Sequence, residues 1–218
     1  MKISFADGVC SHLNHFLTAS SASDSACPEQ LSSFYIMSCP TNGHETRIAP
    51  QSAVAFVDNH DTQPGQALQS WVQDWFKVHA YALILLRDTF CPCVFYGDYK
   101  GIEHDQKGQV PFLDEMVWIR SHLLDVDEME DRLDDWHCIG WCTKGEHPVV
   151  VVMTNGWASG KSFSLPEYRS CSFVDITRND YKVKLDKDGT GTFTCLDGKC
   201  SIYMKEEDYI SMKKELKR

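Results

Sequence analysis

Hydrophobic positions in the first half of the chain alternate between strand-like runs and stretches of helical period. Residues 51–58 and 91–97 are apolar and rich in β-forming side chains, which is typical of strands. Apolar residues recur at helical spacing over about 70–88 and again over about 111–125. Because the first of these helices separates the two strands, we expect a β-α-β unit with parallel strands and a right-handed crossover.

The pattern changes in the second half, where short apolar runs are separated by turn dipeptides. Asn155-Gly156, Asp188-Gly189 and Asp197-Gly198 are typical of tight hairpin turns. Short strands joined by such turns predict an antiparallel β-sandwich. The expected strands are WHCIGWC from residue 136, PVVVVMT from 148, CSFVDIT from 171, YKVKL from 181, GTFTC from 191 and SIYM from 201.

These patterns divide the chain into three regions. Residues 1–50 are poorly patterned and rich in Ser, Ala, Cys and His. Residues 51–130 make up the α/β segment, and residues 131–218 make up an all-β domain. The last residues, KKELKR, mix basic and acidic side chains, and we expect them to form a charged, solvated tail.

Composition and charge exclude several classes of protein. A hydrophobic content of 43% is enough for a folded core, whereas a net charge of −10 argues against a nucleic-acid partner. No run approaches the roughly 18 apolar residues of a membrane span. Polar residues also interrupt the N-terminal stretch MKISFADGVCSH, so we expect no signal peptide and favour a cytoplasmic location.

The ten cysteines leave two explanations open, disulfides of a secreted protein or reduced thiols. Cys91 and Cys93 are two residues apart in a predicted strand, about 6.6 Å along it, and are not expected to pair. Without a leader, reduced thiols are favoured. A zinc site is a third possibility, although the usual C-x2-C spacing is absent; its candidate ligands are His137, Cys138, Cys142 and His147.

The first predicted strand ends abruptly in polar residues. Asp58, Asn59, His60 and Asp61 follow it directly and precede a Pro-Gly turn. A buried parallel strand delivers such side chains to the rim of its sheet, where ligands bind. The residues alone are equally compatible with a structural turn held by Asx side chains.

The same stretch carries a resemblance to a known family. FVDNHDTQPGQ, from residue 56, resembles the strand-seven motif of the α-amylase family of glycoside hydrolases, in particular the liquefying enzymes of bacterial type. WFKVHAYALILLR from 75 and PCVFYGD from 92 are similar to the family's helix seven and strand eight. WHCIGW from 136 and SIYM from 201 are similar to landmarks of its C-terminal β domain. The resemblance covers residues from about 51 to 204.

This resemblance implies a fold and an activity. The fold would be the C-terminal part of a (β/α)8 TIM barrel, about strands six to eight, followed by an antiparallel β-sandwich, with residues 1–50 a remnant of the strand-six region. The family's reaction is the retaining endo-hydrolysis of α-1,4-glucosidic bonds in starch and glycogen. Asp61 would stabilise the transition state, and His60 would bind the substrate.

The sequence also departs from the family. A retaining glycosidase needs a nucleophile and an acid carboxylate, and neither of the family's patterns for them occurs here. Asp134 follows Arg132 at the nucleophile's spacing, but in an acidic stretch before the β domain. We therefore expect the first five barrel strands to be missing, so that turnover would need another polypeptide or further sequence. The alternative is an inactive remnant that binds α-glucan or has a structural role.

Two further expectations concern calcium and the aromatic residues. The family binds calcium between barrel and β domain through aspartates, and Cys138 and Asn155 stand at two of those positions. A thiol and an amide are poor replacements, so we expect no calcium there and no other cofactor. Several tryptophans could carry sugar, but their spacing favours core packing; they are Trp71, Trp75, Trp136 and Trp141.

Overall fold

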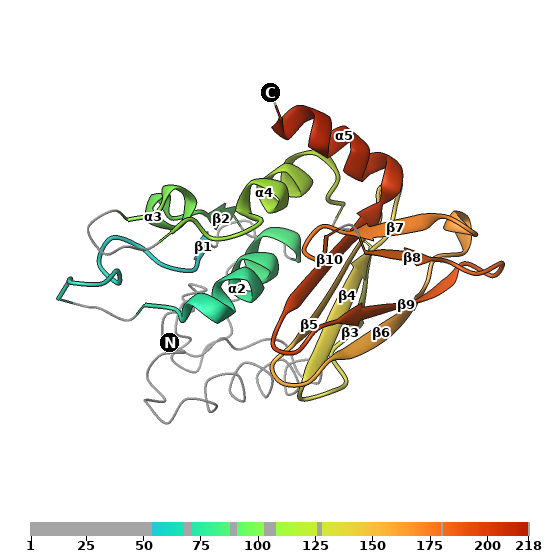
Figure 1. The fold of residues 1–218 in the computed structure, drawn as a ribbon, viewed down its shortest axis with the longest axis horizontal. Coiled ribbons are helices and arrows are strands. Elements are labelled where there is room, and N and C mark those ends of the chain that lie inside the picture. Colours follow the sequence, from blue (N-terminus) through green and yellow to red (C-terminus); the bar gives the residue numbers. More distant parts are fainter. Residues whose placement is uncertain are drawn as a thin grey trace, which may run out of the picture. The chain divides into compact units, whose positions relative to one another are not determined.

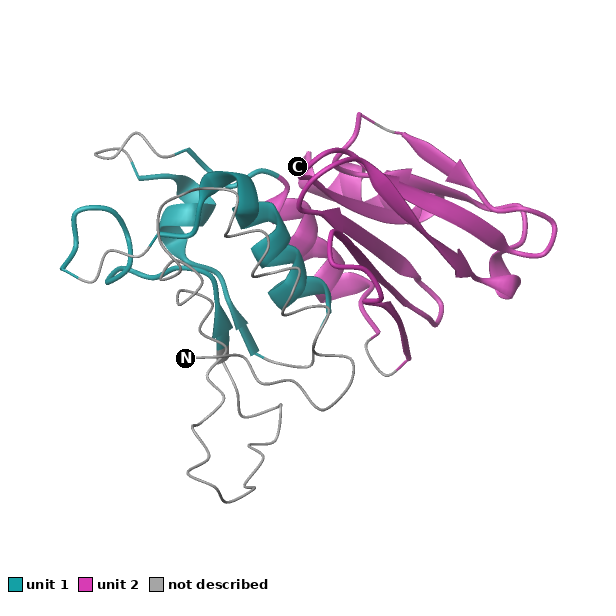
Figure 2. Ribbon diagram, turned by 90° about the horizontal axis from the view of Figure 1, so that it is seen from below, with its two compact units in different colours: residues 1–111 teal, residues 112–218 magenta. Residues whose placement is uncertain are grey.

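Figure 1 shows the computed structural model of the chain. The structure describes residues 54–67, 71–87, 91–102, 108–125, 128–179 and 181–217. The chain divides into two compact units, residues 1–111 and residues 112–218, which Figure 2 shows in teal and magenta. Each unit is described by itself below.

The first unit contains the predicted β-α-β arrangement. Strand β1 (Val54–Phe56) and strand β2 (Cys91–Cys93) pair in parallel, and helix α2 (Asp74–Leu86) connects them. The register places Val54 opposite Cys91 and Phe56 opposite Cys93. Both strands end earlier than the apolar pattern predicts, because the chain turns away from the sheet after residue 56 and enters helix α3 (Tyr96–Lys100) soon after β2.

Helix α2 is buried along most of its length. From His79 to Leu86 every residue is buried, so this helix has no wide polar face. A helix that is apolar nearly all round belongs in a core rather than on a surface. Its burial brings two polar side chains, Lys77 and Tyr81, into the interior of the unit.

The second unit is an antiparallel β-sandwich, as predicted. One sheet has the strand order β3-β4-β5-β10-β7-β8, and a second sheet is formed by β6 and β9. Apolar side chains from both sheets, among them Phe163, Phe193 and Tyr203, form one buried cluster. The strands are β3 (Met129–Arg132), β4 (Cys138–Thr143), β5 (Val149–Thr154), β6 (Ser159–Ser164), β7 (Ser172–Asp175), β8 (Lys182–Lys184), β9 (Thr190–Cys195) and β10 (Cys200–Lys205).

Two helices of this unit differ from the sequence-based expectation. Helix α5 (Glu206–Leu216) extends into the expected tail, residues 213–218. Residues 214–217 are exposed, as predicted, but the segment is helical, and Met212 just before it is buried and anchors one face of the helix. Helix α4 (Leu113–His122) belongs to this unit and contacts α5. The Trp118 indole donates to Glu215 at 2.7 Å across the pair. The division between the units thus falls before α4, whereas the sequence pattern suggested about residue 130.

The described residues contain one pair of parallel strands and no closed barrel. Their seven cysteines are all free thiols, including Cys91 and Cys93, which were expected not to pair. None of the described helices combines the length and apolar character that crossing a lipid bilayer requires. Residues 1–53, which include the expected strand-six region, lie outside the described residues.

Candidate functional site

The predicted site residues lie on the turn that follows strand β1. His60 and Asp61 are both exposed, with 83% and 57% of their side-chain surfaces open to solvent. The His60 Nε2 and the Asp61 Oδ1 are 3.4 Å apart. The turn is held by Asn59, whose Oδ1 accepts hydrogen bonds from the backbone N–H groups of Asp61 at 2.9 Å and Thr62 at 3.0 Å. The pair therefore lies at the carboxyl end of a parallel strand with its polar atoms available to a ligand.

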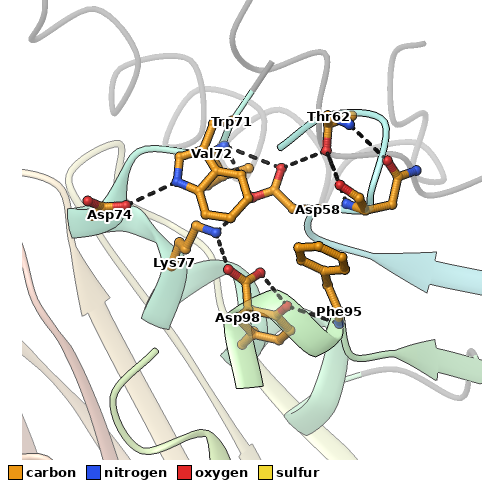
Figure 3. Close-up of polar contacts among 10 residues, drawn as sticks. Asp58, Thr62, Trp71, Val72, Asp74, Lys77, Phe95 and Asp98 are labelled. Atoms are coloured by element: carbon orange, nitrogen blue, oxygen red, sulfur yellow. Dashed lines mark hydrogen bonds and ion pairs between the residues drawn. The ribbon is translucent and has the colours of Figure 1, made fainter. Parts of the chain in front are cut away.

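A buried set of polar side chains lies directly beneath this turn (Figure 3). We call Asp58, Thr62, Lys77, Tyr81 and Asp98 the Asp58 network. Asp58, Lys77 and Asp98 are almost fully buried. Lys77 Nζ lies 2.9 Å from Asp58 Oδ2 and also donates to Asp98 Oδ1. The Tyr81 hydroxyl donates to Asp98 Oδ2 at 2.6 Å. One ammonium thus bridges two carboxylates from different segments.

The network connects three elements of the first unit. Asp58 follows β1, Lys77 and Tyr81 lie one turn apart on α2, and Asp98 lies in α3, just after β2. Trp71 covers the ammonium of Lys77, which is 3.1 Å from its ring centroid, and the Trp71 indole donates to Asp74 at 3.1 Å. The carboxyl ends of both parallel strands are therefore tied to the helix that crosses between them.

Burial dominates the electrostatics of the network. It raises the pKa of Asp58 from 3.8 to about 6, although the neighbouring Lys77 ammonium works in the opposite direction. Burial, followed by the nearby Asp98 carboxylate, raises the pKa of Tyr81 well above its ordinary value, so its phenol stays protonated and donates. With two acids and one base in an enclosed space, proton uptake by Asp58 relieves an excess of negative charge.

The network also fixes the turn that presents His60 and Asp61. The Thr62 hydroxyl donates to Asp58 Oδ1 at 3.1 Å, and the backbone N–H of Asn59 donates to that hydroxyl at 3.0 Å. The backbone N–H of Val72 donates to Asp58 Oδ2 at 3.3 Å. Both ends of the segment between β1 and α2 are therefore fastened to a single buried carboxylate.

Sequence reasoning singled out the exposed pair and missed most of the buried network. Asp58 was noticed as one of the polar residues after the strand, but Lys77, Tyr81 and Asp98 were not. A signal was present: Lys77 and Tyr81 are four residues apart within an otherwise apolar helix, and so share one face of it. A lysine buried in such a helix needs an acidic partner nearby.

The four zinc candidates, all within the described residues, do not come together. His137 Nδ1 lies 2.7 Å from the Asp135 carboxylate, and His147 Nδ1 lies 2.9 Å from Asp208. Cys138 and Cys142 are buried on strand β4. Across the described segments, no three His, Cys, Asp or Glu side chains form a group able to hold a metal ion.

Comparison with known proteins shows which proteins this chain resembles. No protein-family model matches the chain. An α-amylase of Geobacillus stearothermophilus is 37% identical over 169 residues, which cover 74% of this chain and 31% of that protein. The cytoplasmic α-amylase of Escherichia coli strain K12 is 37% identical over 174 residues, covering 72% of this chain and 35% of the relative. This chain resembles the C-terminal part of the bacterial α-amylases. It spans about a third of the length of these relatives.

One solved α-amylase structure resembles this chain in its fold. An α-amylase from Malbranchea cinnamomea matches with a TM-score of 0.53 at 16% identity, over 74% of this chain and 39% of that one. At this identity the likeness concerns the fold alone. It fits the barrel-plus-sandwich architecture of the α-amylases, of which the described residues contain one parallel strand pair and the sandwich.

Cys138 and Asn155 are the residues that the family resemblance places at the calcium position, and their surroundings can be compared with what calcium requires. The Cys138 thiol is fully buried, and burial raises its pKa, which keeps the sulfur protonated. The Asn155 amide nitrogen donates to the Trp136 carbonyl at 3.2 Å. A protonated thiol is a poor calcium ligand, and Asn155 offers only a neutral carbonyl oxygen where the family would have a carboxylate, so we expect these two positions to bind calcium weakly.

The tryptophans expected to pack in the core behave differently from one another. Trp141 is fully buried, as predicted, while Trp71 and Trp75 are half-buried. Trp136 contradicts the expectation, because 47% of its surface is exposed. It precedes strand β4 rather than lying within it, so strand alternation does not direct its side chain inward.

Proposed function

We propose that this chain is part of a glycoside hydrolase of the α-amylase family that acts on α-1,4-linked glucan. The observation that carries the proposal is the exposed His60–Asp61 pair at the carboxyl end of a parallel strand. Barrel enzymes keep their reactive groups at this end of their strands. The reaction of the whole protein would be retaining endo-hydrolysis of α-1,4-glucosidic bonds in starch or glycogen. This proposal is supported by relatives that are named α-amylases.

The two residues have separate roles in this proposal. His60 donates a hydrogen bond to a sugar hydroxyl, and the Asp61 carboxylate accepts one from the same ring. Bonds of this kind accelerate hydrolysis when they strengthen as the ring flattens toward the oxocarbenium-like transition state. The Asp58 network supports them by fixing the turn, since a misplaced contact loses much of its effect on the rate.

A second candidate function is supported by the sequence. The family's nucleophile and acid patterns do not occur in the 218 residues. Asp134, at the right spacing from Arg132, lies in the β-sandwich unit, and its carboxylate is 2.6 Å from Lys161 Nζ. We therefore propose that the chain by itself binds α-glucan without turning it over, and that hydrolysis requires the two carboxylates from further sequence or from a partner polypeptide.

The location of the protein is proposed on two supporting facts. The E. coli relative is named a cytoplasmic α-amylase. The seven cysteines in the described residues are unpaired, which suits a reducing compartment. Detection of the protein in the cytosolic fraction would support this proposal, and recovery from the culture medium would contradict it.

Complementation tests the enzymatic proposal. The purified chain is mixed with the N-terminal segment of a bacterial α-amylase that carries the two missing carboxylates, and reducing sugar released from soluble starch is measured. We expect no release by either part alone and release by the mixture. Asp61→Asn should abolish it, whereas the control Asp188→Asn, at an exposed turn of the β-sandwich unit, should not.

If the two parts do not assemble, the binding of maltoheptaose to the chain alone tests the proposed roles of His60 and Asp61. Maltoheptaose is titrated into the chain, and backbone amide NMR shifts of the turn from Asn59 to Thr62 are followed. Shifts centred on this turn, lost in His60→Ala, would support the glucan site. Unchanged shifts at saturating sugar would refute the proposed roles of His60 and Asp61.

A further inference from the structure

The Thr62 hydroxyl lies between two oxygens that can accept its proton. Its Oγ1 is 3.1 Å from Asp58 Oδ1 and 3.3 Å from the carbonyl oxygen of Asn59. The backbone N–H of Asn59 donates to the same Oγ1 at 3.0 Å. A hydroxyl has one proton to donate and two lone pairs with which to accept, so it donates to one of the two oxygens at a time. The side chain is buried, so these bonds form without competition from bulk water.

The other groups that contact the Asp58 carboxyl are donors. Lys77 Nζ lies 2.9 Å from Oδ2, and the backbone N–H of Val72 lies 3.3 Å from Oδ2 and 3.4 Å from Oδ1 (Figure 3). Neither an ammonium nor a backbone N–H can accept a proton from a carboxylic acid. A proton on Asp58 therefore belongs on Oδ1, with the Thr62 hydroxyl as its acceptor.

Two arrangements of hydrogen bonds satisfy these groups. When Asp58 is ionised, the Thr62 hydroxyl donates to Oδ1. When Asp58 is protonated, it donates to Thr62 Oγ1, and the Thr62 hydroxyl turns to donate to the Asn59 carbonyl. That carbonyl accepts from the backbone N–H of Gln63 at 3.2 Å and has a second lone pair for the hydroxyl. Each of these donors keeps an acceptor in both arrangements, and the backbone of the turn can stay in place.

The charges around Asp58 make its protonation relevant under mildly acidic conditions. Burial raises its pKa from 3.8 to about 6; the Lys77 ammonium opposes the rise, and the Asp98 carboxylate adds to it. The titratable side chains near Asp58 come from α2, α3 and the turn itself; they are Lys77, Tyr81, Asp98, His60 and Asp61.

The same reversal is not open to Asp98. Its Oδ1 accepts from Lys77, and its Oδ2 accepts from the Tyr81 hydroxyl. That hydroxyl receives the backbone N–H of Phe95 at 3.4 Å, and within the described residues it has no second acceptor to which it could turn. A proton on Asp98 would therefore leave a buried donor without an acceptor, which is costly. The contact between Asp58 and Thr62 is the place in the Asp58 network that accommodates a proton.

We propose that Thr62 is a positioning residue for the His60–Asp61 turn, and that its hydroxyl reverses its hydrogen bonds so that the turn keeps its shape whether or not Asp58 carries a proton. The turn depends on this contact because the Asn59 side chain, which accepts from the N–H groups of Asp61 and Thr62, belongs to the residue that the Thr62 hydroxyl holds. The benefit for sugar binding rests on the proposed function, whereas the reversal rests on the distances around Thr62.

Carbon-13 NMR of the natural chain tests the reversal without any substitution. The side-chain carboxyl of Asp58 and the backbone carbonyl of Asn59 are followed from about pH 4.5 to about pH 7.5. The Asn59 carbonyl gains a hydrogen bond as Asp58 takes up its proton, so the two signals should titrate with the same midpoint. An Asn59 signal that does not follow Asp58, or an Asp58 carboxyl that keeps one protonation state throughout, would overturn the proposal.

Two variants and a matched control separate the hydroxyl from the shape of the side chain. Thr62→Val keeps the shape and removes the hydroxyl, so the Asn59 carbonyl should no longer titrate, whereas Thr62→Ser should restore its titration. Thr177 supplies the control, because its hydroxyl makes the same kind of contacts in the β-sandwich unit, with Asp175 Oδ1 at 2.7 Å and the Cys200 carbonyl at 3.0 Å. Thr177→Val should leave the Asn59 signal unchanged.

Binding of maltoheptaose to the same proteins tests the positioning role. Dissociation constants are compared at about pH 5 and about pH 7.5, and the ratio of variant to natural chain cancels the titration of His60, which all of them share. Thr62→Val should weaken binding at least about tenfold more at the lower pH, because the Asp58 proton then lacks its acceptor, and Thr62→Ser should follow the natural chain. Equal weakening at both pH values would show a purely structural Thr62 and overturn the proposal. Absence of binding in every protein, with the Asn59 titration intact, would instead refute the proposed sugar site and support the reversal.

Discussion

Replacing the buried Asp58 by asparagine should change how the stability of the protein depends on pH. The fold raises the pKa of this carboxyl from 3.8 to about 6. The folded state therefore holds the proton more tightly than the unfolded state does. The corresponding stabilisation is fully present below pH 3.8 and is lost as the pH rises through about 6.

The size of the effect follows from the shift. A difference of roughly 2 pH units, at about 1.4 kcal/mol per unit, amounts to about 3 kcal/mol over the whole range. Between about pH 4.5 and about pH 7 the linkage relation gives a loss of roughly 2 kcal/mol from this one group. Asparagine cannot ionise, so the Asp58→Asn variant lacks this loss. It also leaves Lys77 with Asp98 as its charged partner.

Chemical denaturation at the two pH values measures the effect. The free energy of unfolding is obtained for the natural chain and for Asp58→Asn, with tryptophan fluorescence as the signal because Trp71 lies against Lys77. Relative to Asp58→Asn, the natural chain should lose roughly 2 kcal/mol of its free energy of unfolding between the lower and the higher pH. Asp188→Asn serves as the exposed control. Parallel pH profiles for the natural chain and Asp58→Asn would refute the buried, proton-binding role of Asp58.

Four other perturbations give expected outcomes. Lys77→Met leaves two buried carboxylates without their cation and should lower the free energy of unfolding by about 3–5 kcal/mol in urea denaturation, a loss much larger than that of a surface lysine. Trp141→Ala empties a fully buried position and should cost about 3–5 kcal/mol in the same assay. Gly189→Ala should lower the thermal midpoint, because the backbone has φ +81° and a Cβ would lie 2.5 Å from the Leu165 carbonyl oxygen. Excess EDTA should leave the thermal midpoint within about 1 °C of its original value, and a larger drop would show a calcium ion that the donor set does not suggest.

The local sequence pattern predicted correctly those elements whose structure depends on residues close to one another in the chain. The apolar runs and the intervening helical period predicted the parallel β-α-β unit, and the β1–β2 pairing confirms it. Short apolar runs likewise predicted the antiparallel sandwich. The hairpin prediction for the three Asx-Gly dipeptides was wrong, because the strands that they join (β5 and β6, β8 and β9, β9 and β10) are not neighbours in either sheet: the chain crosses from one sheet to the other at these turns. The turn with His60 and Asp61 was recognisable from sequence because its polar residues interrupt an apolar run. The structure shows both side chains exposed on a turn that the Asn59 side chain holds, and their sugar-binding roles stay predictions.

The local sequence pattern did not predict elements whose structure depends on pairing or packing with a segment elsewhere in the unit. Strand β6 consists mostly of small and polar residues and gave no strand signal, yet it pairs along its whole length with β9. Helix α5 was not predicted, because its packing against the unit, with Met212 buried, is what orders this charged segment. Strand β3 lies in an acidic stretch and is held by its neighbour β4.

The sequence by itself determined the order of elements, the class of each half and the candidate sugar-binding turn, since these depend on the period of apolar residues and on a contiguous motif. Only the tertiary structure decided that Asp58, Lys77 and Asp98 share one enclosed space and that Trp136 meets Trp157 at the surface. The physical reason is the same in both cases. Burial and side-chain contacts are set by residues about 20 positions away in the chain, which no local period encodes.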